Sequence, residues 1–345
     1  MIKQSTPSMN KGTDNINRIQ PFLLRPACKD YLWGGSRLRD EFGKDYGVHP
    51  LAETWECSTH PAGVSIIDSG VFKGVPLDKV LKEYPRLLGS HPARTSGPGE
   101  LPVLIKLIDA GESASVQVHP DDAYAAEHEN GQKGKTEMWY VLDAAEDATL
   151  VYGFYQDVQR DQLEEALARN SVEKYIQRVK VRKDDVFYIE PGQVHAIGAG
   201  IVLAEIQQNS NVTYRLYDYN RRDADGKTRE LHVEKALDVA VLHRSAEPRQ
   251  PIRVLKYQPG CATELLCRCK YFQVERVMVN TTGTKAECKF EVGEDSFCAV
   301  LCIEGTGSII TDESLDIQKG NCCFIPAGSG MVKLSGKFQF LKIRC

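Results

Sequence analysis

The chain has no uninterrupted apolar run that approaches the roughly 20 residues needed for a membrane-spanning helix. It also lacks a block of lysine and arginine, and 43 basic against 47 acidic residues give a net charge of −4. This balance excludes the broad positive field of a nucleic-acid-binding surface. The first 18 residues are polar and contain no apolar segment of an export signal, nor do they resemble a transit peptide. We therefore expect a cytoplasmic protein that binds neither nucleic acid nor membrane.

Several motifs of common chemistries are missing as well. The chain contains no Gly-x-Ser-x-Gly elbow and no glycine-rich phosphate loop, which argues against serine-nucleophile chemistry and nucleotide binding. Its eleven cysteines include no Cys-x-x-Cys pair of a structural zinc site. Their odd number, without an export signal, argues against a disulfide framework. We expect them to be small, buried apolar residues.

What the chain does contain is a long series of short, strand-like apolar segments separated by glycine and proline turns. This pattern predicts a mainly β protein, a sandwich or barrel, and 345 residues are enough for two domains. We expect a disordered arm over residues 1–18, a first domain over 19–245 and a second over 252–345. One segment, at about 158–179, has apolar residues at helical spacing and predicts a helical insertion divided at Asn170–Ser171 into two short helices.

A polar set with the chemistry of a metal site lies in the first domain. In the alternating run SVQVH, Ser115, Gln117 and His119 share one face of a predicted strand. Glu137 follows 18 residues after His119, and His195 comes after the turn Pro191-Gly192. Taken singly, each histidine is more often a surface or hydrogen-bonded core residue. Together, two histidines, a glutamate and a glutamine suit Zn²⁺, tolerate other divalent metals, and leave room for substrate.

The spacing of these residues matches the two-motif layout of a cupin barrel. A second copy of the later motif runs from Gly320 to Pro326-Ala327-Gly328 and places Met331 where the motif has histidine. Because no histidine follows His243, the second copy cannot hold a histidine-bound metal. We therefore predict two cupin-like jelly-roll barrels with the metal site in the first.

Three segments, LIKLIDAGESASVQVHPDD, GKTEMWYVLDA and YIEPGQVHAIGAGIVLAEIQQNSNVTYRLYDYNR, together resemble the type I mannose-6-phosphate isomerase family of the shorter bacterial kind. The resemblance covers about residues 22–345, although the segment after Glu53 departs from the family pattern. It implies an isomerase that interconverts mannose 6-phosphate and fructose 6-phosphate through a cis-enediol, with one Zn²⁺ per chain. It also implies a cytoplasmic enzyme that binds a small sugar phosphate, as a monomer or a homodimer.

The resemblance assigns roles to individual residues. The metal ligands fall on Gln117, His119, Glu137 and His195. The catalytic residues fall on Arg215, Lys135 and Glu205, and we expect Ser115 and Glu53 to join Arg215 and Lys135 in contacting substrate.

Alternatives remain open for several of these roles. Arg215 suits either a developing oxyanion or the phosphate. Glu205 is the first candidate for the general base, with Glu53 and Lys135 as alternatives, but it could equally orient Arg215. Two rival functions are an Fe(II)-dependent cupin oxygenase and a sugar-binding cupin without enzymatic activity. The mixed ligand set and the two cations argue against the first, and the intact site argues against the second.

Overall fold

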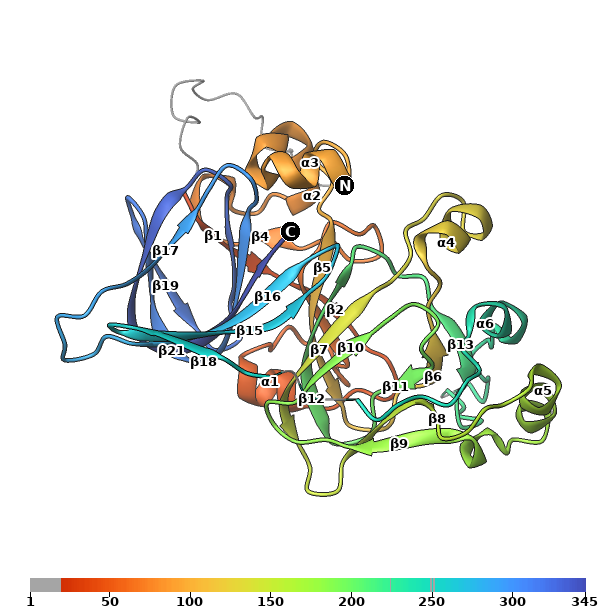
Figure 1. Ribbon diagram of the computed structural model, residues 1–345. Helices are drawn as coiled ribbons and strands as arrows, with labels where there is room; N and C mark the ends of the chain where they lie inside the picture. The colour runs from red at the N-terminus through yellow and green to blue at the C-terminus, as the bar shows by residue number, and fades with distance from the viewer. Residues whose placement is uncertain (1–19, 224, 249, 251) are drawn as a thin grey trace.

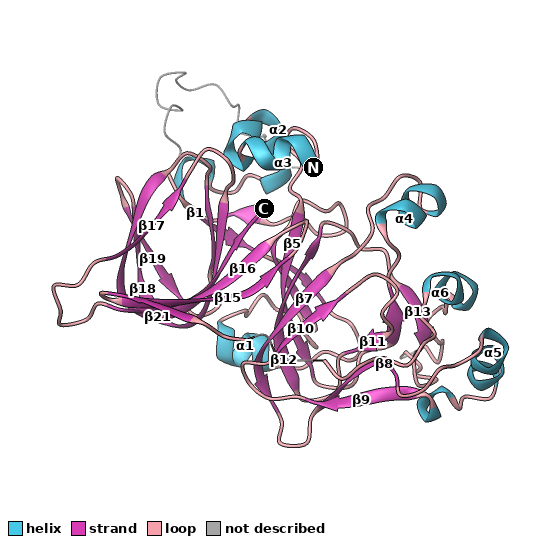
Figure 2. Ribbon diagram, in the orientation of Figure 1, coloured by secondary structure: helices cyan, strands magenta, loops and turns pink. Residues whose placement is uncertain are grey.

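The computed structural model describes residues 20–223, 225–248, 250 and 252–345 (Figure 1). The predicted arm over residues 1–18 lies outside this part of the chain. The described residues form a mainly β protein with six short α-helices, one of which lies between the sheets while the others lie at the outer edge of the view (Figure 2). The helices are α1 (Arg37–Phe42), α2 (Leu77–Glu83), α3 (Ser90–Thr95), α4 (Asp122–His128), α5 (Arg160–Ala168) and α6 (Val233–Val239), with 3₁₀ turns at Gly70–Phe72, Pro85–Leu88 and Val172–Lys174. No helix in the described part of the chain is long and apolar enough to cross a membrane.

A six-stranded sheet occupies the centre of the molecule, with strand order β10-β7-β12-β5-β3-β2. Its strands are β2 (Ala27–Lys29), β3 (Glu53–Cys57), β5 (Val103–Ala110), β7 (Glu137–Ala144), β10 (Val186–Ile189) and β12 (Ile201–Gln208). A five-stranded sheet packs on one side of it, in the order β13-β6-β11-β8-β9. These strands are β6 (Val116–Val118), β8 (Thr149–Phe154), β9 (Ile176–Lys180), β11 (His195–Ala196) and β13 (Tyr214–Tyr217).

A ten-stranded sheet packs on the other side of the central sheet. Eight of its strands come from the end of the chain: β14 (Leu255–Gln258), β15 (Cys261–Arg268), β16 (Gln273–Asn280), β17 (Cys288–Val292), β18 (Cys298–Ile310), β19 (Ser314–Gln318), β20 (Cys322–Ile325) and β21 (Gly330–Arg344). The other two, β1 (Phe22–Arg25) and β4 (Ile66–Ile67), come from its beginning, and β1 pairs directly with β20. None of the three sheets closes on itself within the described residues.

The central sheet is buried on both faces, and the period-two alternation of its strands separates two environments. On β7, Met138 and Tyr140 pack toward the ten-stranded sheet, whereas Trp139 packs toward the five-stranded sheet. On β12, Ala204 and Ile206 pack toward the ten-stranded sheet. The residues between them therefore point to the opposite face, where the polar side chains described below lie.

Two sequence-based expectations need correction. The segment at about 158–179 is helical only in α5 and the turn Val172–Lys174, because Ile176–Lys180 forms strand β9 and pairs with β8. Helical spacing over such a short segment does not exclude a strand, and pairing with a neighbouring strand decides the conformation. Among the cysteines, Cys261 and Cys288 form a disulfide, whereas the other nine are free and five of these are buried.

Candidate active site

Three of the predicted metal ligands meet at one point. His119 follows β6, Glu137 begins β7 and His195 lies in β11, and one ligand atom from each lies within 4.8 Å of the others. All three side chains are buried. The fourth predicted ligand, Gln117 of β6, lies directly across from His195 in the strand register. These positions, distant in sequence, converge because β6 and β11 are neighbours in the five-stranded sheet, which packs on the central sheet that contains β7.

The polar atoms of this cluster lack partners in a way that suits a metal ion. His195 Nδ1 lies 2.8 Å from the carbonyl oxygen of Gln193, a contact that orients the ring and leaves Nε2 facing the cluster. That Nε2 atom and Oε2 of Glu137 are buried and make no hydrogen bond in the described structure, whereas Glu137 Oε1 lies 2.7 Å from the Lys135 ammonium. Buried polar atoms without partners are costly, so their convergence fits a bound cation. The donor set, imidazole nitrogen and carboxylate oxygen, is one that Zn²⁺ accepts.

The protonation states of the cluster also fit a metal. Burial and the nearby Lys135 ammonium lower the pKa of His119 to about 3. Burial likewise lowers the pKa of His195. For Glu137, burial acts to raise the pKa, but the charge of Lys135 and the contact with His119 outweigh it and hold the pKa well below its usual value. The site thus presents neutral imidazoles and an ionised carboxylate, the forms that bind a metal.

Lys135 lies against the same atoms. Its Nζ is 2.7 Å from Glu137 Oε1 and 3.2 Å from His119 Nε2, and the side chain is buried. It is therefore not the solvated loop cation that its sequence context also allowed. The ammonium takes up part of the negative charge that a divalent cation would neutralise.

A second buried charge cluster surrounds Glu205. Its Oε1 is 2.7 Å from Lys106 Nζ, and its Oε2 accepts a hydrogen bond from Trp139 Nε1 at 2.9 Å. Lys106 also lies 3.7 Å from Glu53, whose Oε2 accepts a hydrogen bond from Trp55 Nε1. Burial and the charge of Glu137 raise the pKa of Glu205, whereas Lys106 opposes the rise. The cluster therefore joins two carboxylates through one ammonium.

Arg215 lies in the five-stranded sheet, in β13 next to Gln117 of β6, whereas Glu205 lies in the central sheet. Its Nε donates to Ser115 Oγ at 3.3 Å and its Nη1 donates to the carbonyl oxygen of Glu230 at 2.7 Å. The recorded partners of Glu205 are Lys106 and Trp139, so the geometry gives no support to the idea that Glu205 orients Arg215.

These side chains surround a cavity of about 250 Å³. All six predicted site residues that are not histidine or Glu137 line it, namely Glu53, Ser115, Gln117, Lys135, Glu205 and Arg215. The cavity is slightly smaller than the range typical of small-molecule sites, yet large enough for a compact, polar ligand. It presents both cations and carboxylates, so it can bind an anionic, hydroxyl-rich molecule and transfer protons.

Comparison with known proteins agrees with this arrangement. Residues 22–144 match the family model for the catalytic domain of type I phosphomannose isomerase, and residues 262–344 match the cupin domain of mannose-6-phosphate isomerase. Mannose-6-phosphate isomerase ManA of Bacillus subtilis is 36% identical over 318 residues, which span 92% of this chain and 96% of that relative. The chain belongs to the type I mannose-6-phosphate isomerase family.

Solved structures of mannose-6-phosphate isomerases share the fold. A crystal structure of the Bacillus subtilis enzyme superposes with a TM-score of 0.85 at 31% identity, and the match covers 94% of this chain and 99% of the other. A zinc-bound mannose 6-phosphate isomerase has a TM-score of 0.72, with coverage of 94% and 99%. At 17% identity, the second comparison shows a common fold.

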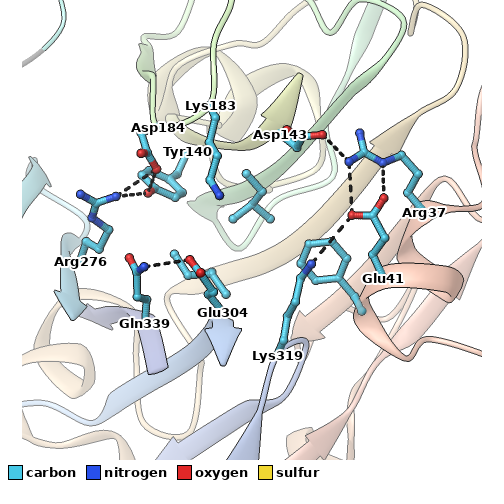
Figure 3. Close-up of a pocket in the computed structure, with 13 residues that line it drawn as sticks. Arg37, Glu41, Tyr140, Asp143, Lys183, Asp184, Arg276, Glu304, Lys319 and Gln339 are labelled. Carbon is cyan, nitrogen blue, oxygen red and sulfur yellow. Dashed lines mark hydrogen bonds and ion pairs between the residues drawn. The ribbon is translucent and has the colours of Figure 1, made fainter. Parts of the chain in front are cut away.

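The described residues also form a second cavity, away from the His119–Glu137–His195 cluster. This larger cleft, of about 380 Å³, lies where the central sheet meets the ten-stranded sheet (Figure 3). Its charged side chains are mostly committed to one another: Arg37 pairs with Glu41 and Asp143, and Arg276 pairs with Asp184. The cleft contains no group of potential metal ligands within the described residues. We regard it as part of the contact between the two halves of the protein.

Two cavity residues of this family member were missed by sequence reasoning. Lys106 had a signal that could have identified it, because it is the single charged residue in the apolar run LPVLIKLI. A lone charge in a strand buried on both faces needs a partner, and that partner is Glu205. Arg229 carried no such signal, because it lies in a polar loop between β13 and α6 and outside the three motifs.

Proposed function

We propose that this chain interconverts mannose 6-phosphate and fructose 6-phosphate. The observation that carries the proposal is the buried cluster of His119, Glu137 and His195 beside a cavity lined by lysine and arginine. The family membership and the names of the relatives support the same substrate pair. An aldose–ketose isomerisation needs a proton moved between C1 and C2 and charge stabilised on two oxygens, and the cavity contains groups for both tasks.

We assign Gln117, His119, Glu137 and His195 as the ligands of one Zn²⁺ ion, with other divalent metals as possible substitutes. When bound, the ion would act as a Lewis acid that stabilises negative charge on the oxygens of C1 and C2. The zinc-bound relative supports the choice of metal.

The remaining residues would carry the proton and hold the substrate. Glu205 is our candidate for the general base that moves the proton by way of a cis-enediol, and the adjacent Lys106 ammonium opposes the rise in its pKa that burial causes. Each carboxylate oxygen has two lone pairs, so the contacts with Lys106 and Trp139 leave Glu205 able to accept a proton. Glu53 and Ser115 would bind substrate hydroxyl groups. Arg215 and Lys135 would bind the anionic parts of the substrate.

We propose that the five- and six-stranded sheets, within residues 19–245, correspond to a metal-binding cupin-like barrel, and that residues 252–345 form a second, degenerate one. The cupin-domain match over residues 262–344 supports the second assignment. Strand β1, from the beginning of the chain, pairs with β20 of the C-terminal sheet and so connects the two parts. We further propose that the enzyme works in the cytoplasm as a monomer or a homodimer.

The test is a coupled spectrophotometric assay that detects fructose 6-phosphate formed from mannose 6-phosphate. We expect turnover by the unmodified protein, and a loss of at least about 100-fold in kcat/KM for His119→Ala and for Arg215→Ala. His243→Ala provides a matched control, because that histidine is exposed and distant in sequence from the motifs. A protein that binds the sugar phosphate without turnover would instead support the sugar-binding alternative.

A further inference from the structure

Two arginines from adjacent segments of the chain line the cavity. Arg215 lies in β13, and Arg229 lies in the loop that connects β13 to α6. The two lysines that line the same cavity, Lys106 and Lys135, are each within 2.7 Å of a carboxylate oxygen of Glu205 or Glu137. The positive charges of these two lysines are therefore largely balanced by the carboxylates of Glu205 and Glu137.

Arg229 forms an ion pair with Asp218 that holds its guanidinium in position. Its Nε donates to Asp218 Oδ2 at 2.8 Å and its Nη2 donates to Asp218 Oδ1, which makes a bidentate pair. Asp218 is buried and also accepts a hydrogen bond from Arg221 at 3.1 Å. A guanidinium has five N–H donors, so three remain on Arg229 for another partner. Asp218 thus fixes the orientation of Arg229 and leaves three of its five donors unused.

Arg215 has no carboxylate partner among the described residues at ion-pair distance, and its recorded partners, Ser115 Oγ and the Glu230 carbonyl, are neutral. Burial, followed by the positive charge of Arg229, lowers the pKa of Arg215. The two guanidinium groups repel each other, Asp218 offsets part of this repulsion, and an anion bound between them would offset more of it. Arg–phosphate pairs have the matching geometry, since the planar guanidinium binds two oxygens at once.

We propose that Arg229 and Arg215 together bind the phosphate of the substrate, and that Arg229 selects phosphorylated over unphosphorylated sugars. This inference rests on the proposed function for the identity of the sugar. Arg229 and Arg221 share the single carboxylate of Asp218. Arg215 has no carboxylate partner in the described part of the chain, so a net positive charge remains here that matches the negative charge of a phosphate. Tyr31, which lines the same cavity, can add a neutral hydroxyl donor, because burial raises its pKa to about 12 and keeps it protonated. The arrangement leaves Lys106 paired with Glu205 and Glu53.

The test compares Arg229→Gln and Arg229→Lys with Arg222→Gln. Arg222 lies on the same loop and is exposed, with its guanidinium bonded to the carbonyl oxygen of Gly226, so it is a matched control. Two quantities are measured on the zinc-loaded protein: the KM for mannose 6-phosphate, and the dissociation constant of inorganic phosphate by calorimetry. Thermal unfolding and the kcat of each variant show whether the site remains folded.

Losing one charge-assisted contact of about 1.5–3 kcal/mol corresponds to a tenfold or greater loss of affinity. We therefore expect Arg229→Gln to raise both the KM and the phosphate dissociation constant at least about tenfold, while kcat changes much less. Arg229→Lys, which keeps a charge beside Asp218, should fold normally and show a smaller rise in both, and Arg222→Gln should show none. Unchanged KM and phosphate binding in both Arg229 variants, or a fall confined to kcat, would overturn the proposal. If the unmodified protein binds phosphate through Arg229 but does not turn over mannose 6-phosphate, the proposed function fails and the phosphate site stands.

Discussion

Lys106 and Glu205 lie directly opposite each other on β5 and β12, and their charged atoms are 2.7 Å apart in a buried site. Both side chains point to the face of the central sheet on which His119, Glu137 and His195 meet, because their strand neighbours Ile105 and Ala204 pack on the other face. The pairing of these two strands therefore sets the position of the candidate base. A cation at this position opposes the rise in the pKa of Glu205 that burial and the charge of Glu137 cause.

We expect Lys106→Met to lower kcat/KM at least about 100-fold, because Glu205 loses its counter-charge and its pKa rises further. The pH optimum of kcat should move upward, since a higher pH is then needed to ionise Glu205. Breaking a buried pair also destabilises a protein by about 3–5 kcal/mol, which urea unfolding would detect. The double variant Lys106→Met/Glu205→Gln should regain part of this stability. Additive losses in the double variant would show that the two residues do not act as a pair.

Lys135 and a metal ion are attracted to the same oxygen of Glu137. We expect Lys135→Met to bind Zn²⁺ at least about tenfold more tightly than the unmodified protein at pH 8, because the competing ammonium is gone. Catalytic turnover should nevertheless fall. A competition titration against a chromophoric chelator measures the affinity. Lys133→Met is the control, since Lys133 is more exposed and pairs with Glu100. Weaker zinc binding by Lys135→Met would mean that the lysine supports the metal site rather than competing with it.

A second buried ion pair, Lys44–Glu56, lies where the central sheet meets the ten-stranded sheet. Burial raises the pKa of Glu56, and Lys44 opposes the rise. A carboxyl whose folded pKa is raised binds more protons when folded, so its contribution to stability falls as pH rises from 4.5 through the folded pKa. Without Lys44 this pKa should rise further.

We therefore expect Lys44→Met to reduce the free energy of unfolding by about 3–5 kcal/mol at pH 8 and by less at pH 5, where Glu56 is more fully protonated. Urea unfolding at the two pH values measures the difference. Lys73→Met removes an exposed pair with Asp68 and should cost about 1 kcal/mol or less at either pH. Equal losses at both pH values for Lys44→Met would contradict the assigned pKa direction.

The sequence predicted those parts of the site that lie in short motifs. The alternation around Gln117 and His119 and the turn before His195 are local patterns, and the structure brings His119, Glu137 and His195 together. Family membership and the mainly β class are also confirmed. The roles of individual catalytic residues remain predictions.

Other features depend on pairing between distant segments, which a local pattern does not contain. Strand β1 joins the C-terminal sheet through β20, although about 300 residues separate them. Lys106 belongs to the site because β5 pairs with β12, and Arg229 belongs to it because a loop folds back over β13. The segment Ile176–Lys180 was predicted as helix because the spacing of its apolar residues fits both a helix and a strand. It forms a strand because it pairs with β8, a contact that the local sequence pattern does not contain.

The most direct test of the account is the activity of the metal-free protein as Zn²⁺ is added back, measured with mannose 6-phosphate as substrate. We predict no activity after chelation and a linear recovery that ends at one Zn²⁺ per chain. His195→Asn should recover little activity at this ratio, whereas the exposed His243→Asn should behave like the unmodified protein. Full activity in the chelated protein, or equal recovery in His195→Asn, would contradict the assignment of this cluster as the catalytic metal site.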